Sequence, residues 1–295
     1  MNTRHITIMV AALLLAACGH RASQQATEAE GMEFATDSIG LDREDSLASI
    51  KVSVDWPTSG NDTLVSSIRQ YICEELAVRP WQEGQPEVKL TDDGKKLVET
   101  TVKEQYDQLA QMGNEARQEG YGYGMTMSSY VHVFKLEETD HYITYLSNSE
   151  GFMGGAHGYA TSTGITFNKK NGHKIGYHTE YNQQTEQFEI KEQTLFSNPK
   201  SDELALLIKE GVRSYFQEFD TEVNDDEKLK DQLMSVDDIN HIPLPSNPPI
   251  FTKQGLCFTY QQYEIASYAV GMINFNISYD KIRPFLTPEA QALID

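Results

Sequence analysis

Long hydrophobic runs, basic residues and familiar catalytic motifs are all scarce in this sequence. The most apolar stretch, residues 6–15, is about ten residues long, and no later segment approaches the roughly 20 that a membrane-spanning helix needs. Lysine and arginine total 24 against 44 aspartates and glutamates, which gives a formal net charge of −20. An acidic chain of this kind is not expected to bind nucleic acid or anionic lipid head groups. Its partners are expected to be neutral or basic.

The chain contains no GxSxG, HExxH or CxxC motif. These motifs hold the nucleophile, the zinc ligands or the redox thiols of large enzyme classes. His173 and His178 are five residues apart, so they do not share a helix face as a metal-binding i, i+4 pair would. The sequence therefore predicts a non-enzymatic protein with no cofactor and no metal site.

The first eighteen residues predict export and a lipid anchor. Arg4 precedes the apolar stretch 6–15, and the tetrapeptide LAAC at 15–18 matches a lipobox. Cleavage before Cys18 would remove Arg4, so the net charge of the mature chain would change from −20 to −21. A plain secretory signal that happens to contain Cys18 is the alternative. Acylation of Cys18 would attach the protein to the cell envelope of a bacterium, and we expect the outer membrane of a Gram-negative species.

Two further cysteines, Cys73 and Cys257, remain after Cys18 is lipidated. In an oxidising compartment they can form a disulfide. Both lie in apolar surroundings, so two buried free thiols are the alternative.

Composition divides the chain into four predicted segments. Residues 1–17 are the signal peptide, and residues 18–46 are the lipidated cysteine with a flexible tether. The part of the tether at 19–30 is polar and has no aliphatic bulk with which to form a core. The remaining residues, roughly 250, are near the upper limit for one core. They are predicted to form two sequential subdomains, 47–160 and 161–295.

Hydrophobic periodicity predicts an α+β fold, with antiparallel sheet meanders and helices packed on one face. An Asn171-Gly172 type I′ turn is expected before a short strand. Four prolines exclude a helix at 241–250. Strands are predicted at 49–56, ending at Pro57, and at 125–136, 142–149, 159–167, 173–175, 251–261 and 272–279. Helices are predicted after a cap at Asn61 or Asp62, along the stripe from Val98 to Met112, after a cap at Ser201 or Asp202, and near 226–234.

Residues 151–159, with the sequence GFMGGAHGY, place His157 among four glycines. One interpretation is structural: an imidazole nitrogen bonds to a buried carbonyl and holds the turn shut. The other is chemical: the glycines expose His157 in a cleft as a general base or a metal ligand. No motif elsewhere supplies an orienting acid or a nucleophile, so the structural interpretation is favoured.

A set of aromatic residues forms the second candidate surface. Exposed aromatic rings can stack on sugars and anchor protein interfaces, although ordinary half-buried sheet packing is the alternative. The set is Tyr121, Tyr123, Phe152, Tyr159, Tyr260, Tyr263 and Tyr268.

Several short motifs carry a family resemblance. They are a Gly-Gly-Ala-His turn at 154–157, Gly255, a Tyr-Glu-Ile-Ala stretch at 263–266, and Gly271 before the last strand. Their order resembles the paired extracellular domains of the RsiV anti-sigma factor and of the PdaC peptidoglycan deacetylase. The resemblance extends over about residues 47–285. It is a resemblance to domains of unknown function that recur in exported bacterial proteins, including lipoproteins.

The resemblance implies a PdaC-like subdomain at 47–160 and an RsiV-like subdomain at 161–295. In the RsiV-like relative the outer domain recognises lysozyme, and in the PdaC-like relative catalysis belongs to a separate domain. This sequence contains neither the sigma-binding segment nor the deacetylase domain, so the resemblance implies the recognition module alone.

We therefore predict a lipid-anchored, non-catalytic binding module that recognises a lysozyme-type muramidase or peptidoglycan. A glycan hydrolase or deacetylase that uses His157 is one alternative, and a scaffold lipoprotein with only a protein partner is another. The predicted binding residues are Gly154, Gly155, His157, Gly158, Tyr159, Tyr263 and Tyr268.

Overall fold

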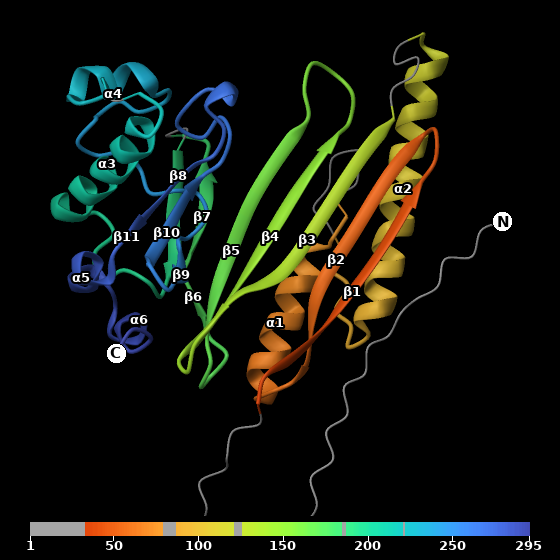
Figure 1. The fold of residues 1–295 in the computed structure, drawn as a ribbon, viewed down its shortest axis with the longest axis horizontal. Coiled ribbons are helices and arrows are strands. Elements are labelled where there is room, and N and C mark those ends of the chain that lie inside the picture. Colours follow the sequence, from red (N-terminus) through yellow and green to blue (C-terminus); the bar gives the residue numbers. More distant parts are fainter. Residues whose placement is uncertain (1–32, 79–86, 121–125, 185–186, 221) are drawn as a thin grey trace, which may run out of the picture. The chain divides into compact units, whose positions relative to one another are not determined.

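Six strands form the larger sheet in a computed structural model, which describes residues 33–295 apart from 79–86, 121–125, 185–186 and 221. The strand order is β1-β2-β3-β4-β5-β6 (Figure 1). The predicted signal peptide and Cys18 lie outside the described residues. The elements of this part are β1 (Ala35–Glu44), β2 (Ala48–Ser59), α1 (Asp62–Glu75), α2 (Gly94–Gln118), β3 (Met127–Glu138), β4 (Tyr142–Phe152), β5 (Tyr159–Asn168) and β6 (Lys174–Ile175).

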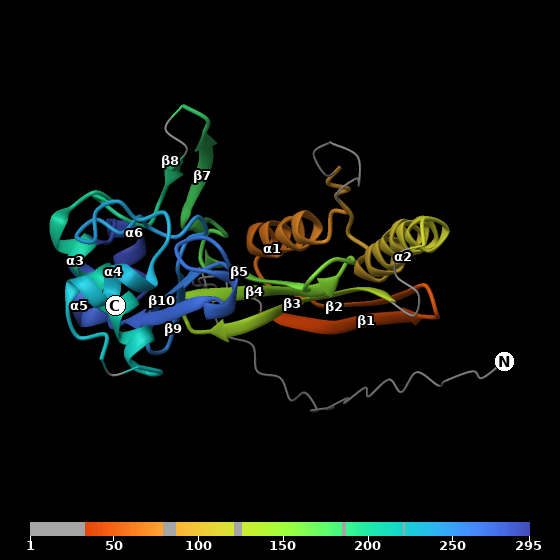
Figure 2. The same ribbon diagram turned by 90° about the horizontal axis from the view of Figure 1, so that it is seen from above.

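Helices α1 and α2 cover one face of this sheet, and within the described residues no helix covers the opposite face (Figure 2). On β2 every second residue from Ile50 to Trp56 is buried, as expected for a strand with one face against helices. Asn61 begins α1 by accepting hydrogen bonds from two backbone N–H groups of the first turn, and Asp93 begins α2 in the same way with one. The α+β class and the one-sided helical layer are therefore confirmed.

Three features of the sheet differ from the prediction. Strand β1 lies inside the predicted tether 18–46, and it pairs antiparallel with β2. It is an edge strand with little apolar content, in which Ile39 is only half-buried and Leu41 is exposed, so its pattern resembles a tether. Strand β2 continues through Pro57. Proline has no backbone N–H to donate, but the pairing of β2 with β3 ends at Val54, so no carbonyl of β3 requires a donor at position 57. Strands β2 and β3 are parallel rather than antiparallel, since a two-helix crossover joins them.

The C-terminal part has a three-stranded sheet of order β11-β10-β9 and a separate β7-β8 hairpin. Helix α3 lies against β11, and Gly211 allows this approach because a Cβ there would lie 2.1 Å from the Phe275 ring. The predicted strand 251–261 is two strands joined by a tight turn. The elements are β7 (Tyr177–Asn182), β8 (Gln187–Gln193), α3 (Asp202–Gln217), α4 (Asp226–Gln232), β9 (Ile250–Thr252), β10 (Gly255–Tyr260), η1 (Tyr268–Val270), β11 (Ile273–Ile277), α5 (Tyr279–Ile282), η2 (Arg283–Phe285) and α6 (Pro288–Gln291).

Two hydrophobic clusters correspond to the two parts of the chain. One lies between the large sheet and helices α1 and α2, and the other lies around α3 and the three-stranded sheet. Strand β5 pairs with β4 along its length, and Phe167 belongs to the first cluster, so the first sheet runs past the predicted boundary at 160/161. Apart from Tyr142 on β4, which belongs to the second cluster, the clusters divide along the chain between Phe167 and Ile175.

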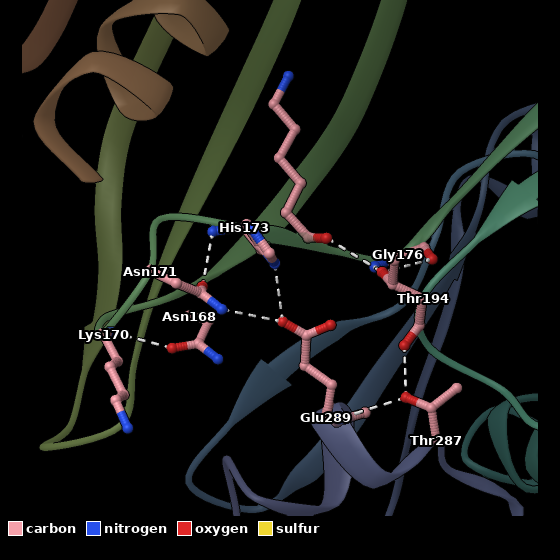
Figure 3. Close-up of polar contacts among 10 residues, drawn as sticks. Asn168, Lys170, Asn171, His173, Gly176, Thr194, Thr287 and Glu289 are labelled. Carbon is pink, nitrogen blue, oxygen red and sulfur yellow. Dashed lines mark hydrogen bonds and ion pairs between the residues drawn. The ribbon is translucent and has the colours of Figure 1, made fainter. Parts of the chain in front are cut away.

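Hydrogen bonds join the two parts at this division. The Thr144 hydroxyl donates to the Phe251 carbonyl at 2.8 Å. Figure 3 shows a second group of contacts, in which the turn after β5 meets α6: Asn171 and His173 both contact the Glu289 carboxylate, at 3.2 and 3.0 Å. In the same view the Thr287 hydroxyl donates to the backbone carbonyl of Thr194.

One local prediction is wrong, and the structure decides between the two alternatives for the cysteines. The turn after β5 is not type I′, because Gly172 has a positive φ of 72° but Asn171 does not, and the loop is closed instead by bonds between Asn168 and both Gly172 and His173. The possible disulfide between the two cysteines is not formed: Cys73 is a buried free thiol on α1, and Cys257 is a free thiol on β10. The two thiols lie in different parts of the protein, as the alternative interpretation predicts.

Candidate functional site

The glycine-rich segment connects β4 to β5, as predicted. Gly154 and Gly155 have φ values of +89° and +96°, a left-handed conformation that strains residues with a side chain. A Cβ on Gly155 would meet no atom within 4 Å, so the backbone conformation rather than lack of space requires glycine there. This conformation leads the chain to an exposed His157 directly before β5.

His157 contacts a second segment of the chain through its ring. The imidazole stacks on Tyr268, with 3.9 Å between ring centroids and 25° between planes. Its Nδ1 lies 2.8 Å from the Gly158 carbonyl, and its Nε2 lies 3.4 Å from the Tyr263 hydroxyl. Because a carbonyl oxygen only accepts, Nδ1 carries the proton and Nε2 is the acceptor for Tyr263. The carbonyl is that of the next residue and is not buried, so His157 joins the loop to another segment rather than closing the turn on a buried acceptor.

That second segment runs between β10 and β11. Tyr263 has a φ of +67°, which is unusual for a residue other than glycine, and 58% of its surface is exposed. Tyr268 begins η1 and donates its hydroxyl to the Gly158 carbonyl at 3.0 Å. We call His157, Tyr263 and Tyr268 the aromatic cluster.

A half-buried carboxylate and an amide hold the aromatic cluster in place. Glu264 accepts hydrogen bonds from the backbone N–H groups of Gln261 and Ser246, at 2.7 and 2.5 Å. Burial raises the pKa of the Glu264 carboxyl despite these bonds. The Gln261 amide bonds both the N–H and the carbonyl of Ser162, so it pairs with β5 as a neighbouring strand would. The exposed tyrosine is thus carried on a supported backbone.

The other predicted aromatic residues lie elsewhere. The Tyr159 hydroxyl lies 3.4 Å from the Ser129 hydroxyl on β3. Tyr260 is fully buried and donates to the Pro243 carbonyl, so it belongs to the core. Tyr121 and Tyr123 lie outside the described residues.

A groove of about 1020 Å³ lies on the face of the large sheet that the helices leave uncovered. Strands β1 to β5 form its floor, and Met272, before β11, also lines it. Tyr130 and His132 contribute rings, and His132 stacks on Phe134 with 4.4 Å between centroids. Short hydroxyl and amide side chains supply much of the remaining surface: Ser49, Ser53, Asn148, Ser149, Thr161 and Ser162.

The charged side chains of the groove are mainly acidic. Asp42, Glu44 and Glu150 oppose a single Lys51. Ser162 lines the groove and is also held by the Gln261 amide, so the groove adjoins the segment that carries the aromatic cluster.

The sequence prediction missed the groove, although the sequence carries its signal. Polar residues occupy the alternate positions of β2, β3 and β4 that face away from the helices, such as Lys51, His132 and Asn148. Strand alternation indicates the buried face, but by itself it does not show whether the opposite face binds a ligand. Three strands with polar residues in register indicate a polar surface wide enough to bind a ligand.

The described residues contain neither a membrane-spanning helix nor a group of metal ligands. No helix there is long and apolar enough to span a membrane. No three His, Cys, Asp or Glu side chains of that same part are grouped so that they could hold a metal ion.

The comparison with protein families identifies part of the chain. Residues 179–280 match the family described as "Protein of unknown function (DUF3298)". The matched segment is similar to that family. It contains Tyr263 and Tyr268 of the aromatic cluster and Met272 of the groove, whereas His157 and the rest of the groove lining precede it. No curated protein matches the chain.

Solved structures extend the likeness to most of the chain. A DUF3298 family member from Bacteroides fragilis has a TM-score of 0.62 and 17% sequence identity, and the match covers 87% of this chain and 94% of that protein. A DUF3298 family protein from Pseudomonas aeruginosa has a TM-score of 0.51 and 13% identity, with 88% and 95% covered. At these identities the likeness shows a shared fold alone.

Proposed function

We propose that the protein is a lipid-anchored, non-catalytic binding module of the bacterial cell envelope, and that it binds a wall-associated ligand in the groove beside the aromatic cluster. The lipobox at 15–18 supports the lipid anchor, and the resemblance to the RsiV and PdaC domains supports a wall-associated ligand. The groove supports the binding part of the proposal, because it is a concave surface of about 1020 Å³ lined by polar and aromatic side chains.

The lining of the groove favours a glycan strand as the ligand. Sugars present hydroxyl and amide groups on one side and C–H groups on the other, so they are bound by polar side chains together with aromatic faces. The groove offers hydroxyls, the Asn148 amide and the Tyr130 ring on one rigid sheet. Tyr263 extends an exposed aromatic ring close by, on the segment that Gln261 attaches to β5.

A basic muramidase-type protein is the second candidate ligand, and the charge of the chain favours it. The net charge is −20, and the groove itself has three carboxylates against one ammonium group. Opposite charge accelerates association and makes affinity depend on salt.

The contacts of His157 favour positioning over catalysis. A general base needs a partner that orients it and a proton that it can remove. Both ring nitrogens of His157 are engaged, one by a backbone carbonyl and the other by a tyrosine hydroxyl. Neither contact is with a carboxylate. The hydrolase alternative therefore has weaker support than the binding module.

Calorimetric titration distinguishes the two ligands. The Cys18→Ala chain is titrated with soluble glycan strands from purified sacculi and, separately, with a basic lysozyme, each at low and at physiological salt. A glycan ligand predicts binding that changes little with salt, whereas a basic protein predicts affinity that falls as salt screens the charges. A folded chain that releases no heat with either ligand would contradict the proposed function.

A further inference from the structure

A second cavity, of about 360 Å³, lies where the two hydrophobic clusters meet. Helix α1, strands β5 and β6, the ends of the β7-β8 hairpin and Pro248 form its walls. Thr163 lines this cavity and its neighbour Ser162 lines the groove, so the two sites lie on opposite faces of β5. A binding role for this cavity is therefore independent of the proposed function of the groove.

The walls of this cavity are tightly packed. A Cβ on Gly164 would lie 2.9 Å from Ile250, and a Cβ on Gly176 would lie 2.9 Å from Pro248. Such distances leave no room for a side chain. The cavity therefore lies between closely fitted backbone segments and is preformed rather than a loosely packed region.

One buried polar group beside the cavity is unpaired. The Tyr71 ring lines the cavity with 6% of its surface exposed, and its hydroxyl is buried without a hydrogen-bond partner among the described residues. Thr163 lies beside it but donates its hydroxyl to Glu75, at 3.3 Å. A buried polar group with no partner costs free energy, so an isolated one points to a ligand that pairs with it.

Glu75 has no direct ion pair within the described part of the chain. Lys174, the ammonium group of this cavity, pairs with the neighbouring Glu74 at 2.8 Å. Among the described residues, no basic side chain lies within ion-pair distance of Glu75. Burial raises the pKa of the Glu75 carboxyl despite hydrogen bonds from Ser147 and Thr163 and the attraction of the more distant Lys174 ammonium group.

The charges of the cavity favour a cation as the ligand. Glu74, Glu75 and Glu192 line it against the single ammonium group of Lys174, which leaves two carboxylates in excess. A primary ammonium group has three N–H donors, enough for the Glu75 carboxylate and the Tyr71 oxygen together. An aliphatic chain attached to it would contact Ile165 and Pro248.

We propose that this cavity binds a primary ammonium group on a short aliphatic chain, with Glu75 as its counter-ion and Tyr71 as a second hydrogen-bond partner. Two sources share this chemistry: a free alkylamine, and a lysine-type side chain of a peptide. The cavity volume is near the lower end of the range for small-molecule sites, as a chain of this size requires.

Titration of the full-length protein in detergent tests the proposal. The probe is pentylamine, which is charged at neutral pH, and its neutral control is 1-pentanol. We expect pentylamine to bind at least about tenfold more tightly than pentanol, and Glu75→Gln to weaken pentylamine by about tenfold or more. Glu99→Gln, the same substitution at an exposed position of α2, should leave the affinity unchanged. Equal affinities for the two probes, or for wild type and Glu75→Gln, would overturn the proposal.

A second variant keeps the test decisive if Glu75→Gln does not fold. Tyr71→Phe removes only the unpaired hydroxyl, so without ligand its melting temperature should be unchanged or raised, while its affinity for pentylamine should fall severalfold. A lower melting temperature would show that the hydroxyl already has a partner, which contradicts the proposal.

A third probe, Nα-acetyl-L-lysine N-methylamide, distinguishes the two sources. Tighter binding of this probe than of pentylamine supports a peptide side chain, and the reverse order supports a free amine. Binding of neither probe overturns the site.

Discussion

Replacement of His157 by alanine tests the role of the aromatic cluster. The substitution removes the stack on Tyr268, at 3.9 Å between centroids, and two exposed hydrogen bonds, to the Gly158 carbonyl and to the Tyr263 hydroxyl, which solvent can replace at Tyr263. That carbonyl still accepts the Tyr268 hydroxyl at 3.0 Å, so no backbone acceptor is left unpaired. The loss is therefore limited to an aromatic pair, worth about 0.5 to 1.5 kcal/mol. For a domain of this size the melting temperature should fall by roughly 2 to 4 °C per kcal/mol.

Thermal denaturation of three variants measures this effect. His157→Ala should show the full decrease, whereas His157→Phe keeps a ring and should retain most of the stability. His141→Ala is the matched control, since His141 is an exposed histidine in the turn between β3 and β4. Its melting temperature should equal that of the wild type.

A catalytic role predicts a different pattern. Substitution of a functional residue often leaves stability unchanged but abolishes turnover. Release of acetate or reducing ends from purified sacculi by each variant provides the readout. If His157→Ala has an unchanged melting temperature and loses a wall-degrading activity that the wild type shows, the positioning role is refuted and the enzyme alternative replaces it.

Other parts of the structure give further predictions. Gly155→Ala should lower the free energy of unfolding by about 1 kcal/mol, because the backbone has a positive φ there. Gly211→Ala should lower it by about 1 to 3 kcal/mol, because the added methyl group would overlap the Phe275 ring of β11. Urea denaturation measures both changes. Burial acts to raise the pKa of Glu138, but two lysine ammonium groups outweigh it and hold the pKa below its ordinary 4.5. This carboxylate therefore stabilises the fold at neutral pH and loses that contribution as the pH falls through its folded pKa, so Glu138→Gln should flatten the acid side of the stability profile. Cys73 and Cys257 are free, so reductant should leave the melting temperature unchanged, and both thiols should react after denaturation without reductant; a missing thiol would contradict this.

Much of the fold could be predicted from local patterns. The Asn61 and Ser201 caps and the apolar spacing after them define α1 and α3, because a helix needs both a start signal and a buried stripe. Strands β3, β4 and β5 follow from alternation. Strand β1 could not be predicted in this way, since an edge strand with little buried surface has no apolar period and is held by its pairing with β2.

The candidate site was predicted only in part. The sequence indicated His157, Tyr263 and Tyr268 separately, and only the fold brings residues more than a hundred positions apart into ring contact. The unpaired hydroxyl of Tyr71 could not be predicted, because its position on α1 is that of an ordinary core residue. Whether a polar group is satisfied depends on what the rest of the chain places beside it.

Co-sedimentation with purified sacculi is the most direct test of the binding module. The Cys18→Ala chain is compared with the same chain carrying Tyr130→Ala and Asn148→Ala, which removes a ring and an amide from the groove. Gln111→Ala, an exposed substitution on α2 at the opposite face of the sheet, is the control. We expect the parent and control chains to sediment with the wall and the groove variant to bind at least about tenfold more weakly. Equal sedimentation of all three chains, or none by the folded parent, would contradict a wall ligand in the groove.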